Sequence, residues 1–209
     1  MRPDPRLRGL YAITRGNYRD TDELLREVGG ALRGGCRIVQ YRDKSTDQKL
    51  RLEQASALAV LCHRHDAVLI VNDDIDLAVT CDADGVHLGR DDADIIEAVT
   101  KLGAGAIVGV SCYNQLDTAR RAAAGGASYV AFGSFFPSPT KPKAARASPR
   151  LLYQWEGMRT PVCAIGGITI RNAAKLVHAG ADMTAVISDL WTAPDIEARA
   201  RQYQRLWEE

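Results

Sequence analysis

Two groups of residues in this sequence have types and spacing that suit phosphate binding. The first is Gln40, Arg42 and Lys44, which stand at every second position. Alternate side chains of an extended chain lie on one face, so an amide and two cations would converge there. Such a group suits a polyanion such as pyrophosphate, to which each charge-assisted hydrogen bond contributes about 1.5–3 kcal/mol. The alternative is a solvated strand edge that binds nothing.

The second group is Gly166 and Gly167, together with Ser188 some twenty residues later. Glycine allows backbone N–H groups to approach a phosphate closely, and a following helix N-terminus favours negative charge. The alternative is a tight turn that requires glycine for its backbone angles alone. The two groups together predict two phosphate-binding regions, and therefore two phosphorylated substrates or one with phosphates at both ends.

Acidic residues follow two further apolar runs. Asp73 and Asp92 have no cluster of histidine and cysteine near them, which favours a hard cation, and Mg²⁺ binds through one or two protein carboxylates. Asp74, Asp91 or Asp92 could instead cap the helices that follow. For His87, which stands close to this cluster, a structural role bonded inside the fold is favoured over metal ligation.

The segment 134–150 is long for a connection in a compact domain, and it contains four of the eight prolines. It also carries basic residues, of which Lys141 follows a Ser-Pro-Thr sequence. Long loops of this kind are usually functional or disordered. We interpret it as a lid that brings Lys141 over an anionic substrate, with a disordered linker as the alternative.

These side chains need a scaffold that gathers them, and eight short apolar runs rich in valine and isoleucine supply it. Such runs are typical of parallel strands covered on both faces. The predicted strands are residues 10–14, 37–41, 68–72, 85–88, 107–111, 129–133, 162–166 and 184–188.

Helical patterns lie between several of these runs. A helix is predicted over 46–64, with Leu52, Ala55, Ala59 and Cys62 on its apolar stripe. A second is predicted over 170–179, after Thr169 as N-cap and before Gly180. A third is predicted over 195–207, with Asp195 as its cap and Ile196, Ala200, Tyr203 and Leu206 on its apolar stripe.

Eight strands, each followed by a helix, predict an α/β protein with a single (β/α)8 barrel domain over residues 1–209. A doubly wound open sheet is the competing architecture, but no Gly-x-Gly-x-x-Gly sequence follows any strand. In the barrel the functional residues belong at the carboxyl ends of the strands. The candidate phosphate-binding and metal-binding residues all stand at such ends or in the loops that follow them.

Composition excludes several classes of protein. Lys plus Arg number 27 against 26 Asp plus Glu, a net charge of +1, which excludes nucleic-acid binding driven by bulk charge. No apolar run approaches the roughly 18 residues of a membrane span, and the polar start lacks the apolar core of a signal peptide. The five cysteines match no structural zinc spacing, so we expect free thiols and a cytoplasmic location.

A family resemblance fits these features. The ordered segments YAIT (11–14), VQYRDK (39–44), VND (71–73), DGVHLGRDD (84–92), GVS (109–111), PSPTK (137–141), AIGGI (164–168) and AVIS (185–188) closely resemble thiamine phosphate synthase. That family has a (β/α)8 barrel. It joins 4-amino-2-methyl-5-hydroxymethylpyrimidine diphosphate to 4-methyl-5-(2-phosphoethyl)thiazole and releases pyrophosphate.

The resemblance implies a role for each matching position. It places Gln40, Arg42, Lys44 and Asn72 at the pyrimidine diphosphate, Ser111 at the pyrimidine side, and Asp73 and Asp92 at Mg²⁺. It places Ser138 and Thr140 near the thiazole phosphate and Lys141 at the leaving pyrophosphate. Gly167, Ile187 and Ser188 would cradle the thiazole phosphate. Arg42, Lys44, Ser111 and Lys141 are then the catalytic set.

The sequence departs from the family pattern at a few positions, and other functions fit the same fold. Relatives often carry arginine at the position of Asp74, histidine at Tyr113 and proline at Ser134, which affects substrate fine-tuning more than the reaction. The alternative functions are a thiazole phosphate tautomerase of the same superfamily and a non-catalytic binding protein. The expected partners are the two small-molecule substrates, with a homo-oligomer possible and neither nucleic acid nor membrane involved.

Overall fold

A closed parallel barrel forms the centre of the protein in a computed structural model, which describes residues 4–89, 95–137 and 145–208. Each strand pairs in parallel with the next, and β8 pairs back onto β1. The strands are β1 (Gly9–Ile13), β2 (Ile38–Tyr41), β3 (Val68–Asn72), β4 (Gly85–Leu88), β5 (Ile107–Tyr113), β6 (Tyr129–Gly133), β7 (Val162–Ile165) and β8 (Met183–Val186). This closure confirms the barrel and excludes the doubly wound open sheet.

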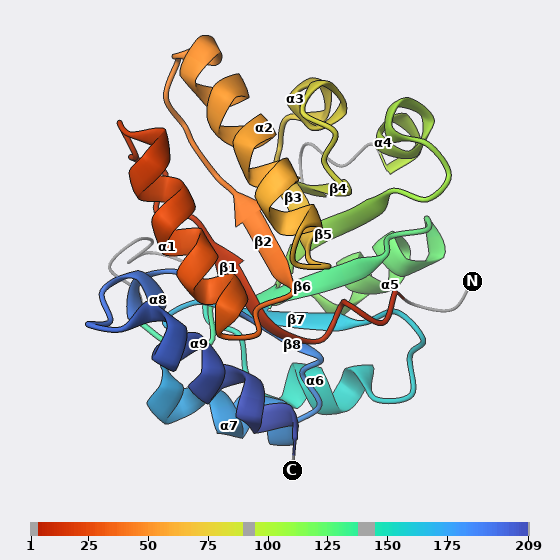
Figure 1. Ribbon diagram of the computed structural model, residues 1–209. Helices are drawn as coiled ribbons and strands as arrows, with labels where there is room; N and C mark the ends of the chain where they lie inside the picture. The colour runs from red at the N-terminus through yellow and green to blue at the C-terminus, as the bar shows by residue number, and fades with distance from the viewer. Residues whose placement is uncertain (1–3, 90–94, 138–144, 209) are drawn as a thin grey trace.

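Helices surround the strands on the outside of the barrel (Figure 1). The helix α1 packs between α2 and α9, so the last long helix covers the strand with which the barrel begins. The helices are α1 (Thr21–Arg33), α2 (Gln48–His63), α3 (Ile75–Thr80), α4 (Ile95–Leu102), α5 (Leu116–Ala124), α6 (Arg150–Trp155), α7 (Ile170–His178), α8 (Ser188–Trp191) and α9 (Ile196–Gln204), followed by the 3₁₀ turn η1 (Arg205–Trp207).

The predicted strands are confirmed, with small differences at their ends. β8 begins one residue earlier than predicted and ends two residues earlier, at Val186, whereas β5 continues two residues past its predicted end to Tyr113. A register shift between Ser111 and Tyr113 lets it do so, and Tyr113 has a left-handed backbone with φ of 53°. A bulge of this kind locally redirects the strand, here at the end where functional residues are expected.

Two helix predictions need correction. Leu52 was placed on the buried stripe of 46–64, yet it is 37% exposed because it lies at the edge of the arc centred on Leu58 and Cys62. The predicted helix 195–207 ends as an α-helix at Gln204 and tightens into a 3₁₀ turn. The predicted caps are confirmed: Asp195 accepts a hydrogen bond from the Ala198 N–H at 2.9 Å, and Asn172 accepts one from the Thr169 N–H at 2.9 Å.

Strand side chains alternate between two apolar layers. Inward-facing residues fill the barrel, among them Tyr11, Ile38, Ile70, Tyr129 and Met183. Their outward-facing neighbours, such as Leu10, Val39 and Leu69, pack against the helices. The barrel interior is therefore a packed core rather than a channel, which leaves its two ends for polar residues.

At the amino ends of the strands, polar side chains satisfy backbone N–H groups. Four strand-entry N–H groups donate to side-chain oxygens: Leu10 to Gln204 at 2.9 Å, Leu69 to Asp84 at 2.8 Å, Val108 to Ser128 at 3.0 Å and Val162 to Asp182 at 2.8 Å. Without these side-chain acceptors the N–H groups at the start of the strands would be unpaired, and a buried unpaired N–H is costly. Polar residues at this end of the barrel thus have a structural role.

The cysteines and the lengths of the helices agree with the composition of the chain. All five cysteines are buried free thiols, as their spacing predicted. Among the described residues no helix has the length and apolar character needed to cross a membrane.

Candidate active site

A pocket of about 460 Å³ opens at the carboxyl ends of the strands. Its wall includes seven of the residues predicted from sequence: Gln40, Arg42, Asn72, Ser111, Gly167, Ile187 and Ser188. These come from β2, β3 and β5 and from the segments just after β2, β7 and β8, so barrel closure brings together residues almost 150 positions apart in the sequence. We call this the central pocket.

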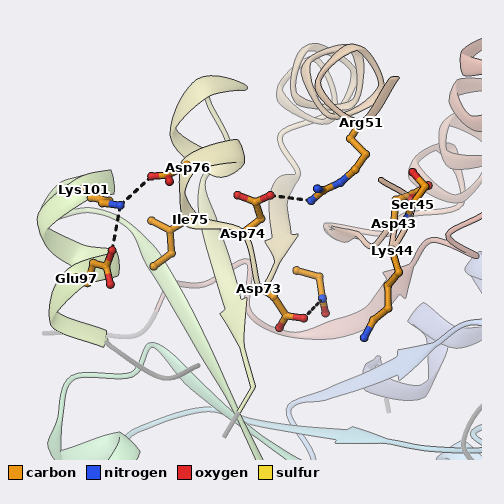
Figure 2. A pocket seen from close by; sticks show the side chains of 11 residues that line it. Asp43, Lys44, Ser45, Arg51, Asp73, Asp74, Ile75, Asp76, Glu97 and Lys101 are labelled. Carbon is orange, nitrogen blue, oxygen red and sulfur yellow. Dashed lines mark hydrogen bonds and ion pairs between the residues drawn. The ribbon is translucent and has the colours of Figure 1, made fainter. Parts of the chain in front are cut away.

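A second, more polar pocket shares one lining residue with the first, and we call it the outer pocket (Figure 2). Lys44 and Asp73 line it, and Asn72 lines both pockets. The prediction that Gln40, Arg42 and Lys44 share one face therefore needs correction, because Lys44 lies in the outer pocket. The regular strand β2 ends at Tyr41, so alternation does not extend to Lys44.

Asp73 is held at the end of β3 in an unusual backbone conformation. Its φ is 64°, in the left-handed region that aspartate adopts more readily than most residues. Its N–H donates to the carbonyl of His87 at 2.9 Å, and its Oδ2 accepts from Asn72 Nδ2 at 2.7 Å. The backbone turn directs an exposed carboxylate toward the same side of the outer pocket as Lys44 (Figure 2).

Asp74 has a different role from its neighbour. Its Oδ1 accepts from the Leu77 N–H at 2.9 Å, which confirms the capping interpretation for this residue. Its Oδ2 accepts from Arg51 Nη2 at 2.8 Å (Figure 2). The guanidinium of Arg51, from α2, thus stands beside Asp74 in the outer pocket.

The two predicted cations of the second strand are available to a ligand. Within residues 4–89, 95–137 and 145–208, neither the Arg42 guanidinium nor the Lys44 ammonium has a hydrogen-bond or ion-pair partner. An arginine that lines a pocket without an internal carboxylate favours an anion in that pocket.

The glycine pair after β7 is required by sterics as well as by conformation. Gly166 and Gly167 have φ values of 105° and 62°. A Cβ on Gly166 would overlap Ser134, and one on Gly167 would overlap the carbonyl oxygens of Phe136 and Pro137. The pair therefore allows the segment after β6 to pack tightly over this wall of the central pocket, so the tight-turn interpretation holds and is compatible with close approach of a ligand.

The floor of the central pocket is crossed by a continuous series of hydrogen bonds that sequence reasoning missed. We call it the interior hydrogen-bond path. Its links are Gln40 Nε2 to Tyr11 OH at 2.8 Å, Tyr11 OH to Tyr129 OH at 2.7 Å, Tyr129 OH to His87 Nδ1 at 2.9 Å and His87 Nε2 to Ser111 Oγ at 2.9 Å. The predicted structural role of His87, bonded inside the barrel, is confirmed.

The path could have been found from one signal. Tyr11 and Tyr129 stand in strands whose other side chains are all apolar, and a buried phenol usually has a hydrogen-bond partner. Burial raises the pKa of both phenols, so they stay protonated. Burial likewise raises the pKa of Cys163, which lines the same pocket and therefore remains a thiol.

Four predicted site residues lie outside the described part of the chain: Asp92, Ser138, Thr140 and Lys141. In the described part, no three His, Cys, Asp or Glu side chains cluster as a metal site would require. The proposed Mg²⁺ pair is thus represented there by Asp73 alone.

The architecture and the site together define a class of protein: a (β/α)8 barrel with a polar pocket at the carboxyl ends of its strands. The thiamine monophosphate synthase family matches residues 10–190. A thiamine-phosphate synthase from Thiobacillus denitrificans is 56% identical over 200 residues, covering 95% of this chain and 94% of that relative. One from Methylobacillus flagellatus is 51% identical over 203 residues, covering 97% of each.

A solved structure agrees with the sequence relatives. The thiamine phosphate pyrophosphorylase from Pyrococcus furiosus superposes with a TM-score of 0.84 at 32% identity, covering 98% of both chains. The chain belongs to the thiamine-phosphate synthase family, and it is an enzyme of that class.

Proposed function

We propose that this enzyme joins 4-amino-2-methyl-5-hydroxymethylpyrimidine diphosphate to 4-methyl-5-(2-phosphoethyl)thiazole, giving thiamine phosphate and pyrophosphate. One observation carries the proposal: Arg42 and the glycine turn at Gly166 and Gly167 line the same pocket from different parts of the barrel. Two anion-binding regions on one cavity suit two phosphorylated substrates that must meet inside it.

The reaction is the alkylation of a nitrogen. The bond between the pyrimidine methylene carbon and the diphosphate oxygen breaks, and its electron pair leaves with pyrophosphate. The aminopyrimidine ring delocalises the positive charge left on the methylene carbon. The lone pair of the thiazole nitrogen then forms the new carbon–nitrogen bond. No nucleophile from the protein is needed, so the protonated state of Cys163 is compatible with the mechanism.

In this mechanism the protein's main task is to stabilise charge on the departing pyrophosphate. Arg42 and Lys44 have no internal partner in the described residues, and their charges can therefore act on the ligand. Lys141 would add a third cation. The hydroxyls of Ser138 and Thr140 would bind near the thiazole phosphate.

The donor set at the outer pocket fits Mg²⁺. Asp73 offers a carboxylate exposed to the same pocket as Lys44, and Asp92 would be the second acidic ligand. When bound, Mg²⁺ supplies Lewis-acid neutralisation of the diphosphate charge. Asn72 orients the Asp73 carboxylate through its hydrogen bond at 2.7 Å.

The thiazole phosphate belongs at the other side of the central pocket. Gly167, Ile187 and Ser188 line that side, and α8 begins at Ser188. Gln40 and Ser111, on the pocket floor, are left to the pyrimidine ring. A tautomerase would use the glycine side and leave the Arg42 and Lys44 side without a purpose, so the tautomerase is not favoured.

The test mixes the purified enzyme with both substrates, with Mg²⁺ or with excess chelator, and follows pyrophosphate and thiamine phosphate. We expect both products in equal amounts, and only with Mg²⁺. The variant Lys141→Ala should fold normally and lose most of this activity. Full activity in chelator would favour the tautomerase, and near-normal turnover by Lys141→Ala would remove the role proposed for that residue.

A further inference from the structure

We propose that the interior hydrogen-bond path has a single proton order, in which Gln40 presents an acceptor and Ser111 presents a donor to the pyrimidine ring. Tyr11, Tyr129 and His87 are then positioning residues that act through Gln40 and Ser111. This inference rests on the proposed function for the identity of the ligand, but the proton order itself is a property of the protein alone.

The order follows from counting protons once the Gln40 amide is oriented with Nε2 toward the Tyr11 hydroxyl, as in the structure; the opposite orientation would reverse every bond and place the His87 proton on Nδ1. Its Nε2 donates to the Tyr11 hydroxyl at 2.8 Å, so that hydroxyl is an acceptor in this bond. A phenol has one proton. Tyr11 therefore donates its proton to the Tyr129 hydroxyl, 2.7 Å away. Both tyrosine side chains are buried, with 1% and 0% of their surface exposed, so water does not compete for these bonds.

The same count continues through Tyr129 and His87. The Tyr129 hydroxyl accepts from Tyr11 and has one proton left, which it donates to His87 Nδ1 at 2.9 Å. A nitrogen that accepts is unprotonated, so the neutral imidazole carries its proton on Nε2. His87 Nε2 then donates to the Ser111 oxygen, 2.9 Å away. If Nδ1 carried the proton instead, the Tyr129 oxygen would face two donors, the Tyr11 hydroxyl and the His87 Nδ1–H. The Tyr129 hydroxyl proton would then no longer have His87 Nδ1 as its acceptor.

Ring contacts hold the participants in place. The His87 and Tyr129 rings stack at a centroid distance of 5.6 Å, and the Tyr11 and Tyr129 rings meet edge to face at 5.8 Å. Gly109 creates the space for this arrangement, because a Cβ at that position would overlap the Tyr129 ring. The path is therefore seated by sterics as well as by hydrogen bonds.

The two ends of the path face the central pocket with opposite polarity. Gln40 Oε1 has no donor within the described residues, which makes it an acceptor for a ligand. Ser111 accepts from His87, and its own hydroxyl proton is left to donate into the pocket. An aminopyrimidine has the complementary groups, an exocyclic N–H donor and ring-nitrogen acceptors. A ring with a donor where the aminopyrimidine has an acceptor would face the Ser111 hydroxyl donor with a second donor, and a buried donor without an acceptor is costly.

The proton order can be measured without substrate. The protein contains four histidines, so replacing His63, His65 and His178 by glutamine leaves His87 as the single imidazole. With ¹⁵N-labelled histidine, we expect the spectrum of a neutral ring protonated on Nε2. A ring protonated on Nδ1, or a mixture of the two forms, overturns the proposal. Because no substrate is present, this result is independent of the proposed function.

The consequence for substrate binding is tested by Tyr129→Phe, which removes the donor to His87 Nδ1. The matched control is Tyr41→Phe, since Tyr41 is also buried and also bonded to a glutamine, Gln54, but packs outside the barrel. We expect Tyr129→Phe to lower kcat/KM for the pyrimidine diphosphate about tenfold or more, while KM for the thiazole phosphate changes little.

The outcomes separate the two proposals. A loss shared equally by both substrates, or matched by Tyr41→Phe, would show a general structural defect and overturn the positioning role. If Tyr129→Phe does not fold, the spectrum of the single-imidazole variant decides the proton order. The expected spectrum in a protein that forms no thiamine phosphate would refute the proposed function and leave the proton order standing.

Discussion

The two ends of the barrel use the same residue types for different purposes. At the amino ends of the strands, Asp84, Asp182 and Gln204 accept hydrogen bonds from strand-entry N–H groups. At the carboxyl ends, Asp73 directs its carboxylate into a pocket, and Gln40 lines one. The three side chains at the first end are occupied by the fold, whereas at the second end some, such as Asp74, are occupied by the fold and others, such as Asp73 and Gln40, line a pocket.

Backbone conformation shows the same division. Asp66, Asp73 and Asp82 all have left-handed backbones, with φ between 51° and 64°. Asp66 and Asp82 stand in loops that enter strands, where the conformation merely turns the chain. Only for Asp73 among these three does the turn place a carboxylate in the pocket beside Lys44. Position relative to the barrel, rather than residue type or backbone angle, therefore separates function from structure.

The largest expected effect is on activity, and it comes from comparing the variants Asp73→Asn and Asp66→Asn. Asparagine also tolerates the left-handed region, so both variants should keep their unfolding free energy within about 0.5 kcal/mol. Asp73→Asn should lower Mg²⁺-dependent activity on the order of 100-fold, because it removes a charged ligand of the metal. Asp66→Asn should keep full activity. If Asp73→Asn and Asp66→Asn had equal activity, the proposed functional difference between the two ends of the barrel would be wrong.

The next effect is on stability and comes from Asp84→Ala. This change leaves the buried Leu69 N–H unpaired and removes the contact of Asp84 with His63, so we expect a loss of about 1–3 kcal/mol in chemical denaturation. The folded fraction should retain normal activity. Asp84→Asn keeps an acceptor oxygen and should lose less. A large loss of activity per folded molecule would show that this end of the barrel also serves the site.

A smaller effect is expected from substituting two glycines that both have positive φ, Gly167 and Gly126. Gly167→Ala introduces a Cβ against the carbonyls of Phe136 and Pro137, whereas Gly126→Ala at the other end of the barrel meets nothing within 4 Å. Both variants incur left-handed strain of about 1–2 kcal/mol. Only Gly167→Ala should also raise KM for the thiazole phosphate, by about tenfold. An unchanged KM would assign Gly167 to the turn alone.

The smallest effect concerns the cysteine thiols, whose pKa is raised by burial wherever they stand in the barrel. Burial raises the pKa of Cys36 and Cys81 to about 11, and it raises the pKa of Cys163 as well. A raised thiol pKa means less thiolate at neutral pH and a reaction that accelerates only as pH rises toward that value. We expect no reaction with a thiol reagent at about pH 8 until the protein is unfolded, when all five react. Rapid labelling of Cys163 in the native protein would show an open, ionised pocket floor.

Much of this organisation was predictable from local pattern. The runs at 68–72, 85–88 and 129–133 match β3, β4 and β6 residue for residue, because buried parallel strands require continuous apolar side chains. The position of Arg42, Asn72, Ser111 and Gly167 at one pocket followed from the rule that parallel strands in a barrel carry their functional residues at one end.

Other features were not predictable from pattern. Lys44 was expected beside Gln40, but strand alternation depends on where the regular strand stops, and β2 stops at Tyr41. Leu52 was expected in the core, but burial on a helix depends on which arc its neighbours cover. The partnership of Arg51 with Asp74 joins residues 23 positions apart, and neither residue's own surroundings in the sequence point to it.

The sequence by itself determined the elements, the order of the barrel and the chemical types at its carboxyl end, because these depend on short-range periodicity and on general rules of parallel sheets. Tertiary structure alone decided which polar groups meet. The path from Gln40 through Tyr11, Tyr129 and His87 to Ser111 draws on five different strands. Hydrogen bonds depend on distances of about 3 Å and on orientation, and only barrel closure sets those for residues so far apart in the chain.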